Sequence, residues 1–203
     1  MFRPCIDLHA GHVKQIVGST LTDSDQSGDP ITHYVSKRPA GWYARLYRRD
    51  ALRGGHVIML GPGNETAALE ALGAWPGGMQ LGGGVTDENA RRYLDGGASH
   101  VIVTSWVFRE GRIDFDRLRR LVGAIGKQRL VLDLSCRKRP DGYCVATDRW
   151  QKTTDTRIDA DSLGALSANC DEFLVHAVDV EGKQAGVDLE LVELLGRLSP
   201  IPT

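Results

Sequence analysis

Cys5-Ile6-Asp7-Leu8 and Val131-Leu132-Asp133-Leu134 are the two stretches of sequence on which the fold prediction depends. In each, a short apolar run ends in an aspartate followed by a leucine. Such runs are typical of strands that are buried in a parallel sheet. The two stretches lie four predicted strands apart, as expected if two half-barrels were duplicated.

Working outward from these stretches, apolar runs alternate with longer amphipathic ones along the chain. The predicted strands are residues 5–8, 56–60, 79–81, 100–104, 130–134 and 172–177. The predicted helices are residues 42–52, 65–72, 87–94, 115–125, 161–166 and 189–198. Thr86 and Asp188 precede two of the helices and are predicted to be their N-caps. The segment 19–33 is rich in Asp, Ser, Thr and Gly and is predicted to be a mobile first loop that could act as a lid.

This order of elements predicts an α/β protein with a parallel sheet and right-handed crossovers. A doubly wound sheet and a closed barrel both satisfy the pattern, and the repeated aspartate stretches favour the barrel. We therefore expect a (β/α)8 TIM barrel with about its first six βα units present. We expect one domain over residues 1–203, incomplete at its C-terminus, because no seventh or eighth strand follows the last helix.

Composition limits the classes of partner and compartment. The formal net charge of −1 and the 41% hydrophobic content predict neither a nucleic-acid nor a membrane partner. No apolar run approaches the ~18 residues of a membrane-spanning helix. The N-terminus shows no signal or transit peptide, and the four cysteines show neither metal-ligand nor disulfide spacing. We expect a cytoplasmic protein without a metal site.

Asp7 and Asp133 are the leading candidates for chemistry. Each ends an apolar strand, and the carboxyl ends of barrel strands are where active sites lie. In an eight-stranded ring, strands one and five are opposite each other, so the two carboxylates would face across the mouth. Such a pair can divide acid and base roles. The alternative is that each aspartate only caps the turn that follows it.

A glycine run and two hydroxyl residues suggest a phosphate site. Gly82, Gly83 and Gly84 follow the third strand directly, where backbone N–H groups can approach an oxyanion closely. Thr104 and Ser105 end the next strand and would add two hydroxyls beside that loop. A tight turn is the alternative explanation of the glycines.

Other polar residues follow the fifth and sixth strands. Trp150 lies in a polar excursion (residues 147–152), from which it can stack on a flat ring or pack on the barrel surface. His176, Asp179 and Glu181 follow the sixth strand. A carboxylate here is a possible third acid or base, and His176 is either a substrate contact or a structural histidine.

Several of these stretches resemble the ProFAR isomerase family of histidine biosynthesis, in its eukaryotic-type form. The stretches that carry the resemblance are residues 5–18, 56–62, 82–84, 101–106, 131–138 and 178–182. The resemblance runs over nearly the whole chain in the same order. It implies a (β/α)8 barrel and the cofactor-free Amadori rearrangement of an aminoaldose to an aminoketose, on a phosphorylated ribose substrate. We expect a monomer.

The resemblance also implies roles for individual residues. Asp7 matches the base that moves the proton at C2 of the ribose, and Asp133 matches the partner carboxylate. Glu181 occupies the position of an aspartate that acts as acid in bacterial relatives, so the acid is Asp133, Asp179 or Glu181. The phosphate-site positions are matched by Gly83, Gly84, Thr104 and Ser105, and the stacking loop by Trp150.

Two departures from the family leave other functions open. Met59 stands where a longer polar side chain is expected, and the family's second phosphate loop, on strands seven and eight, has no match here. The alternatives are a related cyclase, a dual-substrate isomerase that also serves tryptophan synthesis, or a non-catalytic phosphate-binding fragment. The eukaryotic-type stretches argue against the first two.

Overall fold

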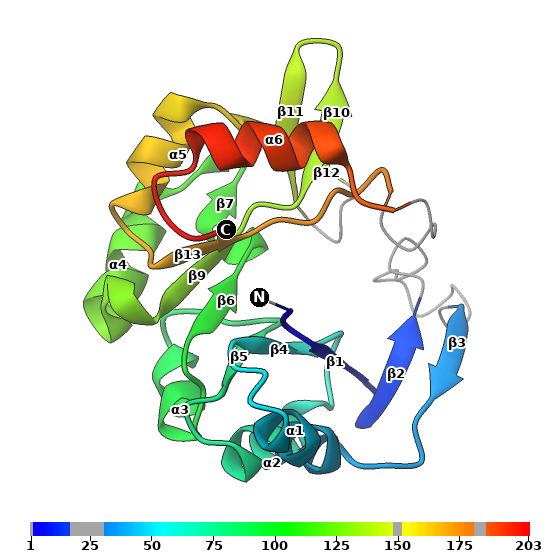
Figure 1. Cartoon of the computed structure of the whole chain (residues 1–203). Coiled ribbons are helices and arrows are strands. Elements are labelled where there is room, and N and C mark those ends of the chain that lie inside the picture. The colour runs from blue at the N-terminus through cyan, green and yellow to red at the C-terminus, as the bar shows by residue number, and fades with distance from the viewer. Residues whose placement is uncertain (1, 17–30, 148–151, 181–185) are drawn as a thin grey trace. The chain divides into compact units, whose positions relative to one another are not determined.

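The computed structural model describes residues 2–16, 31–147, 152–180 and 186–203. The described chain divides into two compact units, one over residues 2–16 and 31–102 and one over residues 103–203 with the gaps just named. Figure 1 shows both units with their elements labelled. Each unit is described by itself.

The first unit is built on a mainly parallel sheet. Its strands follow the order β6-β5-β4-β1-β2-β3. The parallel members are β1 (Cys5–His9), β4 (Gly55–Met59), β5 (Met79–Gly82) and β6 (Val101–Val103), whose last residue falls in the second unit. The strands β2 (His12–Ile16) and β3 (Thr32–Val35) extend the sheet in antiparallel fashion.

Alternation along β1 separates a core face from a polar face. Ile6 and Leu8 are buried in the core, whereas Cys5, Asp7 and His9 stand on the other face. The helices are α1 (Ala40–Arg49), α2 (Glu65–Ala74) and α3 (Ala90–Asp95). Small residues let α1 and α2 pack closely, because a Cβ at Gly41 would stand 2.7 Å from Oε1 of Glu70.

The second unit contains a parallel pair of strands, β9 (Leu130–Asp133) and β13 (Glu172–Leu174), in which Asp133 pairs with Leu174. Its helices are α4 (Phe115–Ile125), α5 (Ala160–Ser167) and α6 (Leu189–Leu198). The side chains of Asp114, Asp159 and Asp188 cap the N-termini of these helices. After α6 the chain returns to β13, where the Phe173 N–H donates to the carbonyl oxygen of Pro202 at 2.9 Å.

Antiparallel strands complete the second unit. A hairpin of β7 (Phe108–Arg109) and β8 (Arg112–Ile113) precedes α4. A three-stranded sheet of β10 (Cys136–Arg139), β11 (Gly142–Thr147) and β12 (Lys152–Arg157) follows β9. Figure 1 shows β10 and β11 side by side as a hairpin.

Every predicted strand and helix has a counterpart in the structure, and α4 and α6 match the prediction to the residue. The predicted N-cap at Thr86 is wrong: α3 begins at Ala90 and follows Asn89, whose Oδ1 accepts from the Thr86 N–H at 2.8 Å. The predicted sixth strand is too long, since β13 ends at Leu174. The polar excursion after the fifth strand is flanked by β11 and β12, which the sequence analysis missed. The strands β2 and β3 were also missed, and β3 overlaps the end of the predicted first loop.

A tyrosine links the three-stranded sheet to α6. The Tyr143 hydroxyl lies 3.0 and 2.9 Å from the two carboxylate oxygens of Asp188, the N-cap of α6. Burial raises the pKa of Tyr143, and the hydrogen bond to Asp188 raises it further. A raised phenol pKa means that this contact is fully present below the unfolded pKa near 10 and is lost only at higher pH.

The change Tyr143→Phe should lower the free energy of unfolding by about 1.5 to 3 kcal/mol, the usual range for a hydrogen bond to a charged group. Chemical denaturation at neutral pH measures this loss. Tyr34→Phe is the matched control, because Tyr34 is 53% exposed on β3. Equal stability of the two variants would contradict a stabilising role for the Tyr143 contact.

Candidate active site

Asp7 lies on the polar face of β1, near the carboxyl end of the strand. The Cys5 thiol donates to Asp7 Oδ1 at 3.1 Å. Strand register pairs Asp7 with Ile58 and Ile58 with Gly82. Asp7 therefore lies two strands from the residue that begins the glycine run, roughly 10 Å across the sheet. This register brings a predicted catalytic carboxylate and a predicted phosphate loop to one edge of one sheet.

Asn64 organises the loops at this edge and was missed as a site residue. It is only 1% exposed, and its Oδ1 accepts from the Gly11 N–H at 2.8 Å. Its Nδ2 donates to the Gly61 carbonyl oxygen at 2.9 Å. The side chain thus ties the turn after β1 to the loop after β4. The turn Gly61-Pro62-Gly63-Asn64 was visible in the sequence, but its partner at Gly11 lies 53 residues away.

Asn64→Ala should lower the free energy of unfolding by about 1 to 3 kcal/mol, because the part-buried hydrogen bonds to the Gly11 N–H and the Gly61 carbonyl oxygen are lost. Thermal or chemical unfolding measures the change. Asn169→Ala serves as control, since Asn169 is only half-buried and its Nδ2 donates to the carbonyl oxygen of Ala165, four residues earlier, in an exposed hydrogen bond. That control should change stability by less than about 0.5 kcal/mol. A similarly small change for Asn64→Ala would show that the hydrogen bonds of Asn64 to Gly11 and Gly61 contribute little to stability.

Gly83 and Gly84, the last two residues of the glycine run, differ in the space around them. Gly83 has a φ of +97°, and a Cβ there would stand 2.1 Å from the carbonyl oxygen of Met59. Gly84 has a φ of +69°, and a Cβ there would meet nothing within 4 Å. Asn89 holds the loop by donating to the Gly84 carbonyl oxygen at 3.0 Å. Gly83 is therefore required by packing against β4, while the space beside Gly84 is open.

In the second unit the structure brings two other predicted residues, Thr104 and His176, to Asp133. Thr104 Oγ1 donates to Asp133 Oδ2 at 3.0 Å. His176 Nδ1 lies 3.5 Å from Asp133 Oδ1. Ser135, which the sequence analysis did not single out, donates to the same Oδ1 through its hydroxyl at 2.6 Å and its N–H at 2.8 Å. The bond from the Ser135 N–H makes an Asx-turn, in which an aspartate accepts from the backbone two residues on, and Asp133 at the end of a predicted strand was the available signal.

The electrostatics of this cluster favour the ionised form of Asp133. Burial alone would raise the pKa of Asp133, but the charge of His176 and the hydrogen bonds from His176 and Ser135 outweigh burial and lower it. The Cys136 thiol lies nearby, and burial raises its pKa to about 12, so the thiol stays protonated at neutral pH. Asp133 is therefore an anchored anion in the described cluster.

The remaining predicted residues are placed as follows. Asp179 Oδ2 accepts from the backbone N–H of Lys138 at 2.8 Å. Ser105 begins a short 3-10 helix, Ser105–Val107. Trp150 and Glu181 lie outside the described residues, so their predicted roles stay predictions.

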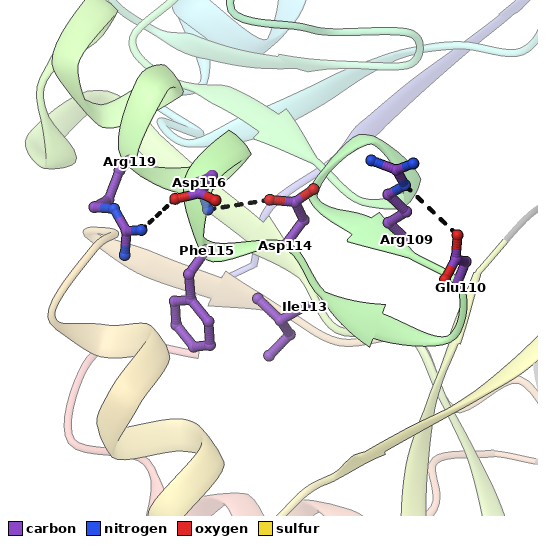
Figure 2. Close-up of a pocket in the computed structure, with 7 residues that line it drawn as sticks. All are labelled: Arg109, Glu110, Ile113, Asp114, Phe115, Asp116 and Arg119. Atoms are coloured by element: carbon purple, nitrogen blue, oxygen red, sulfur yellow. Dashed lines mark hydrogen bonds and ion pairs between the residues drawn. The ribbon is translucent and has the colours of Figure 1, made fainter.

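A surface cavity of about 360 Å³ lies elsewhere in the second unit. It is lined by Arg109, Glu110, Ile113, Asp114, Phe115, Asp116 and Arg119. Figure 2 shows Arg119 directed at Asp116 and Arg109 directed at Glu110. Asp114 is occupied as the N-cap of α4. The cavity contains no predicted site residue. Two of its ion pairs, Arg109 with Glu110 and Arg119 with Asp116, lie among the lining residues, while Asp114 pairs with Arg117 outside the lining.

Two further findings concern the described part of the chain. It contains no group of three or more His, Cys, Asp or Glu side chains that could hold a metal ion. None of its helices has both the length and the apolar character needed to cross a bilayer.

These features define the class of protein: an α/β protein on mainly parallel strands, with aspartates at strand ends. The family model described as "Histidine biosynthesis protein" matches residues 1–203, and the chain belongs to that family.

Similar proteins carry one activity in their names. A phosphoribosyl imidazole-4-carboxamide isomerase of Medicago truncatula, named as chloroplastic, is 58% identical over 99% of this chain and 66% of its own length. Isomerases of the same name from Neurospora crassa and Saccharomyces cerevisiae are each 50% identical. They match 99% and 96% of this chain, and 79% and 74% of their own lengths. The chain thus spans about two thirds to four fifths of these relatives.

Proposed function

We propose that this chain is an intramolecular aldose–ketose isomerase that converts the ProFAR aminoaldose into the aminoketose PRFAR in histidine biosynthesis. The observation that carries the proposal is the 50–58% identity to isomerases named for this reaction, over nearly the whole chain. Asp7 near the end of β1 and Asp133 at the end of β9 add chemical support.

The reaction needs acid and base groups and no redox partner. An acid protonates the ribose ring oxygen, which opens the ring to an iminium at C1. A base, proposed to be Asp7, removes the C2 proton, and the enaminol forms. A proton is then added at C1 while the enol hydroxyl at C2 gives up its proton, and the ketone forms at C2. Atoms and electrons balance within one molecule, so carboxylates and an imidazole are sufficient chemistry.

We also propose that the two units belong to one (β/α)8 barrel and one domain, with six of its units in residues 1–203. The strand-then-helix order of both units supports this arrangement, as does the polar face of β1 opposite the core. In such a barrel, Asp7 and Asp133 face the same mouth. One phosphate of the substrate would be held by Gly83, Gly84, Thr104 and Ser105. Trp150 would stack on a flat ring of the substrate, and Glu181 is a further candidate for the acid.

The proposed partner is a small phosphorylated ribose, bound by a monomer without nucleic acid or cofactor. A cytoplasmic location stays a prediction from the sequence. Light scattering coupled to size-exclusion chromatography tests the monomer, and a larger mass would contradict it.

The decisive experiment is incubation of the purified natural protein with ProFAR in D2O. The expected product is PRFAR with deuterium at C1, detected by mass spectrometry and NMR. Phosphoribosylanthranilate, and PRFAR with ammonia, test the dual-substrate and cyclase alternatives. Binding of ProFAR without turnover would instead favour a non-catalytic phosphate-binding protein.

A further inference from the structure

Ser135 sits between the two titratable side chains of the second unit. It is fully buried, with 0% of its surface exposed. Its Oγ lies 2.6 Å from Asp133 Oδ1 and 3.0 Å from His176 Nδ1. The three side chains form a continuous chain of contacts from the end of β9 to the segment after β13.

Counting protons decides the direction of these hydrogen bonds. A serine hydroxyl carries one proton, and an ionised carboxylate only accepts. The lowered pKa of Asp133 keeps its carboxylate ionised, so the Ser135 proton points to Asp133. The contact at His176 Nδ1 must then be donated by the imidazole. The 3.5 Å distance from Nδ1 to Asp133 Oδ1 agrees, since an N–H suits a neighbouring anion and a lone pair does not.

The donors on Asp133 further limit its role. Its Oδ1 accepts two hydrogen bonds from Ser135, and its Oδ2 accepts one from Thr104. Hydrogen bonds to the charged form stabilise that form. Asp133 is thus held as an anion in one orientation and is poorly suited to carry the acid proton in the resting protein.

We propose that Ser135 is a positioning residue that fixes the Asp133 carboxylate and holds His176 as its Nδ1–H form, so that His176 exchanges its second proton at Nε2. Asp133, Ser135 and His176 are named the relay. The relay also assigns the acid step of the reaction to His176, whose protonated form the Asp133 carboxylate stabilises. That assignment rests on the proposed function. Which nitrogen of a histidine is protonated is set by the bond that the other makes.

The charged and titratable groups around His176 in the described residues are consistent with this role. Asp133 lies on β9, and the Cys136 N–H on β10 donates to the His176 carbonyl oxygen at 2.9 Å. The Cys136 thiol is protonated, and Asp179 is bound to the Lys138 N–H. Among them, Asp133 is the anion that approaches the imidazole at Nδ1, at 3.5 Å.

The first test measures the tautomer directly, without substrate. Protein labelled with ¹⁵N-histidine is studied by long-range ¹H–¹⁵N NMR above neutral pH, and the His176 signals are assigned with the variant His176→Asn. We expect a protonated Nδ1 and an unprotonated Nε2. A protonated Nε2 with a bare Nδ1 overturns the relay, whatever the activity of the protein.

The second test is kinetic. Ser135→Ala should lower kcat by about 10- to 100-fold and change KM by less than about threefold. This is the usual size of effect for a residue that orients a functional side chain without contacting the substrate. Ser135→Thr keeps the hydroxyl and should restore most of the rate. Unchanged kcat in Ser135→Ala, or no rescue by threonine, overturns the positioning role.

Ser36→Ala is the matched control, because Ser36 is a buried serine of the first unit. Its hydroxyl contacts the Tyr43 hydroxyl at 3.0 Å and accepts from the Arg38 N–H at 2.8 Å. The control should lose stability without losing kcat. If the natural protein shows no turnover while His176 has the expected tautomer, the isomerase proposal fails and the structural part of the relay stands.

Discussion

Asp7→Asn is expected to lower kcat by about 10²- to 10⁴-fold, the range that a positioned acid or base contributes to a reaction. The amide has nearly the shape of the carboxylate but cannot accept the C2 proton. Because Asp7 lies on the polar face of β1 and not in the core, the fold should tolerate the change. KM for ProFAR should stay within a fewfold of its original value.

Steady-state kinetics on ProFAR measures this effect. Asp155→Asn is a matched control, since Asp155 is an exposed strand aspartate paired with Arg112 at 3.6 Å. That control should keep its kcat. Near-normal kcat in Asp7→Asn would remove Asp7 from the mechanism, and loss of cooperative unfolding would show instead that Asp7 has a structural role.

Gly83→Val is expected to give the largest loss of stability, about 3 kcal/mol or more. Its φ of +97° strains any residue with a Cβ, and that Cβ would meet the Met59 carbonyl oxygen at 2.1 Å. Backbone atoms of β4 cannot move aside as a flexible side chain does. For a chain of this length, such a loss lowers Tm by roughly 6 to 12 °C. Calorimetry or circular dichroism measures the shift.

Gly84→Ala separates the effect of packing from the effect of binding. Its φ of +69° costs about 1 to 2 kcal/mol, but its Cβ enters open space. If the loop holds a phosphate, the methyl group should raise KM for ProFAR while the protein stays folded. An unchanged KM would favour the alternative that the glycines only make a turn. A Gly83→Val variant as stable as the original would contradict the close approach to Met59.

Local sequence predicted the elements whose signals are themselves local. The helix α4 begins after Asp114, whose carboxylate accepts from the N–H groups of Asp116 and Arg117, and its apolar residues share one face. The helix α6 begins after Asp188 in the same way. The start of α3 was predicted wrongly because Thr86 and Asn89 are both capping residues. In the structure Asn89 stands at the N-cap position without a side-chain hydrogen bond into the helix. Its side chain instead accepts from the Thr86 N–H and donates to the Gly84 carbonyl oxygen.

The antiparallel sheet after β9 was missed for a different reason. Arg137, Lys138 and Arg139 on β10 are exposed, so the strand has no apolar run. Its pairing with β11 supplies the backbone hydrogen bonds that stabilise it. A polar strand of this kind is recognisable only with its partner.

By itself, the sequence determined that Asp7 and Asp133 lie near the ends of short apolar strands and that capped amphipathic helices follow most strands. These are properties of residues that are close in sequence, because the apolar pattern and the capping residues can be recognised within one or two turns of chain. Only the tertiary structure decided that Ser135 joins Asp133 to His176, 41 residues away, and that Gly83 lies against Met59. Such contacts depend on which strands pair and in which register, and hydrogen bonds and close packing form only once that register is set.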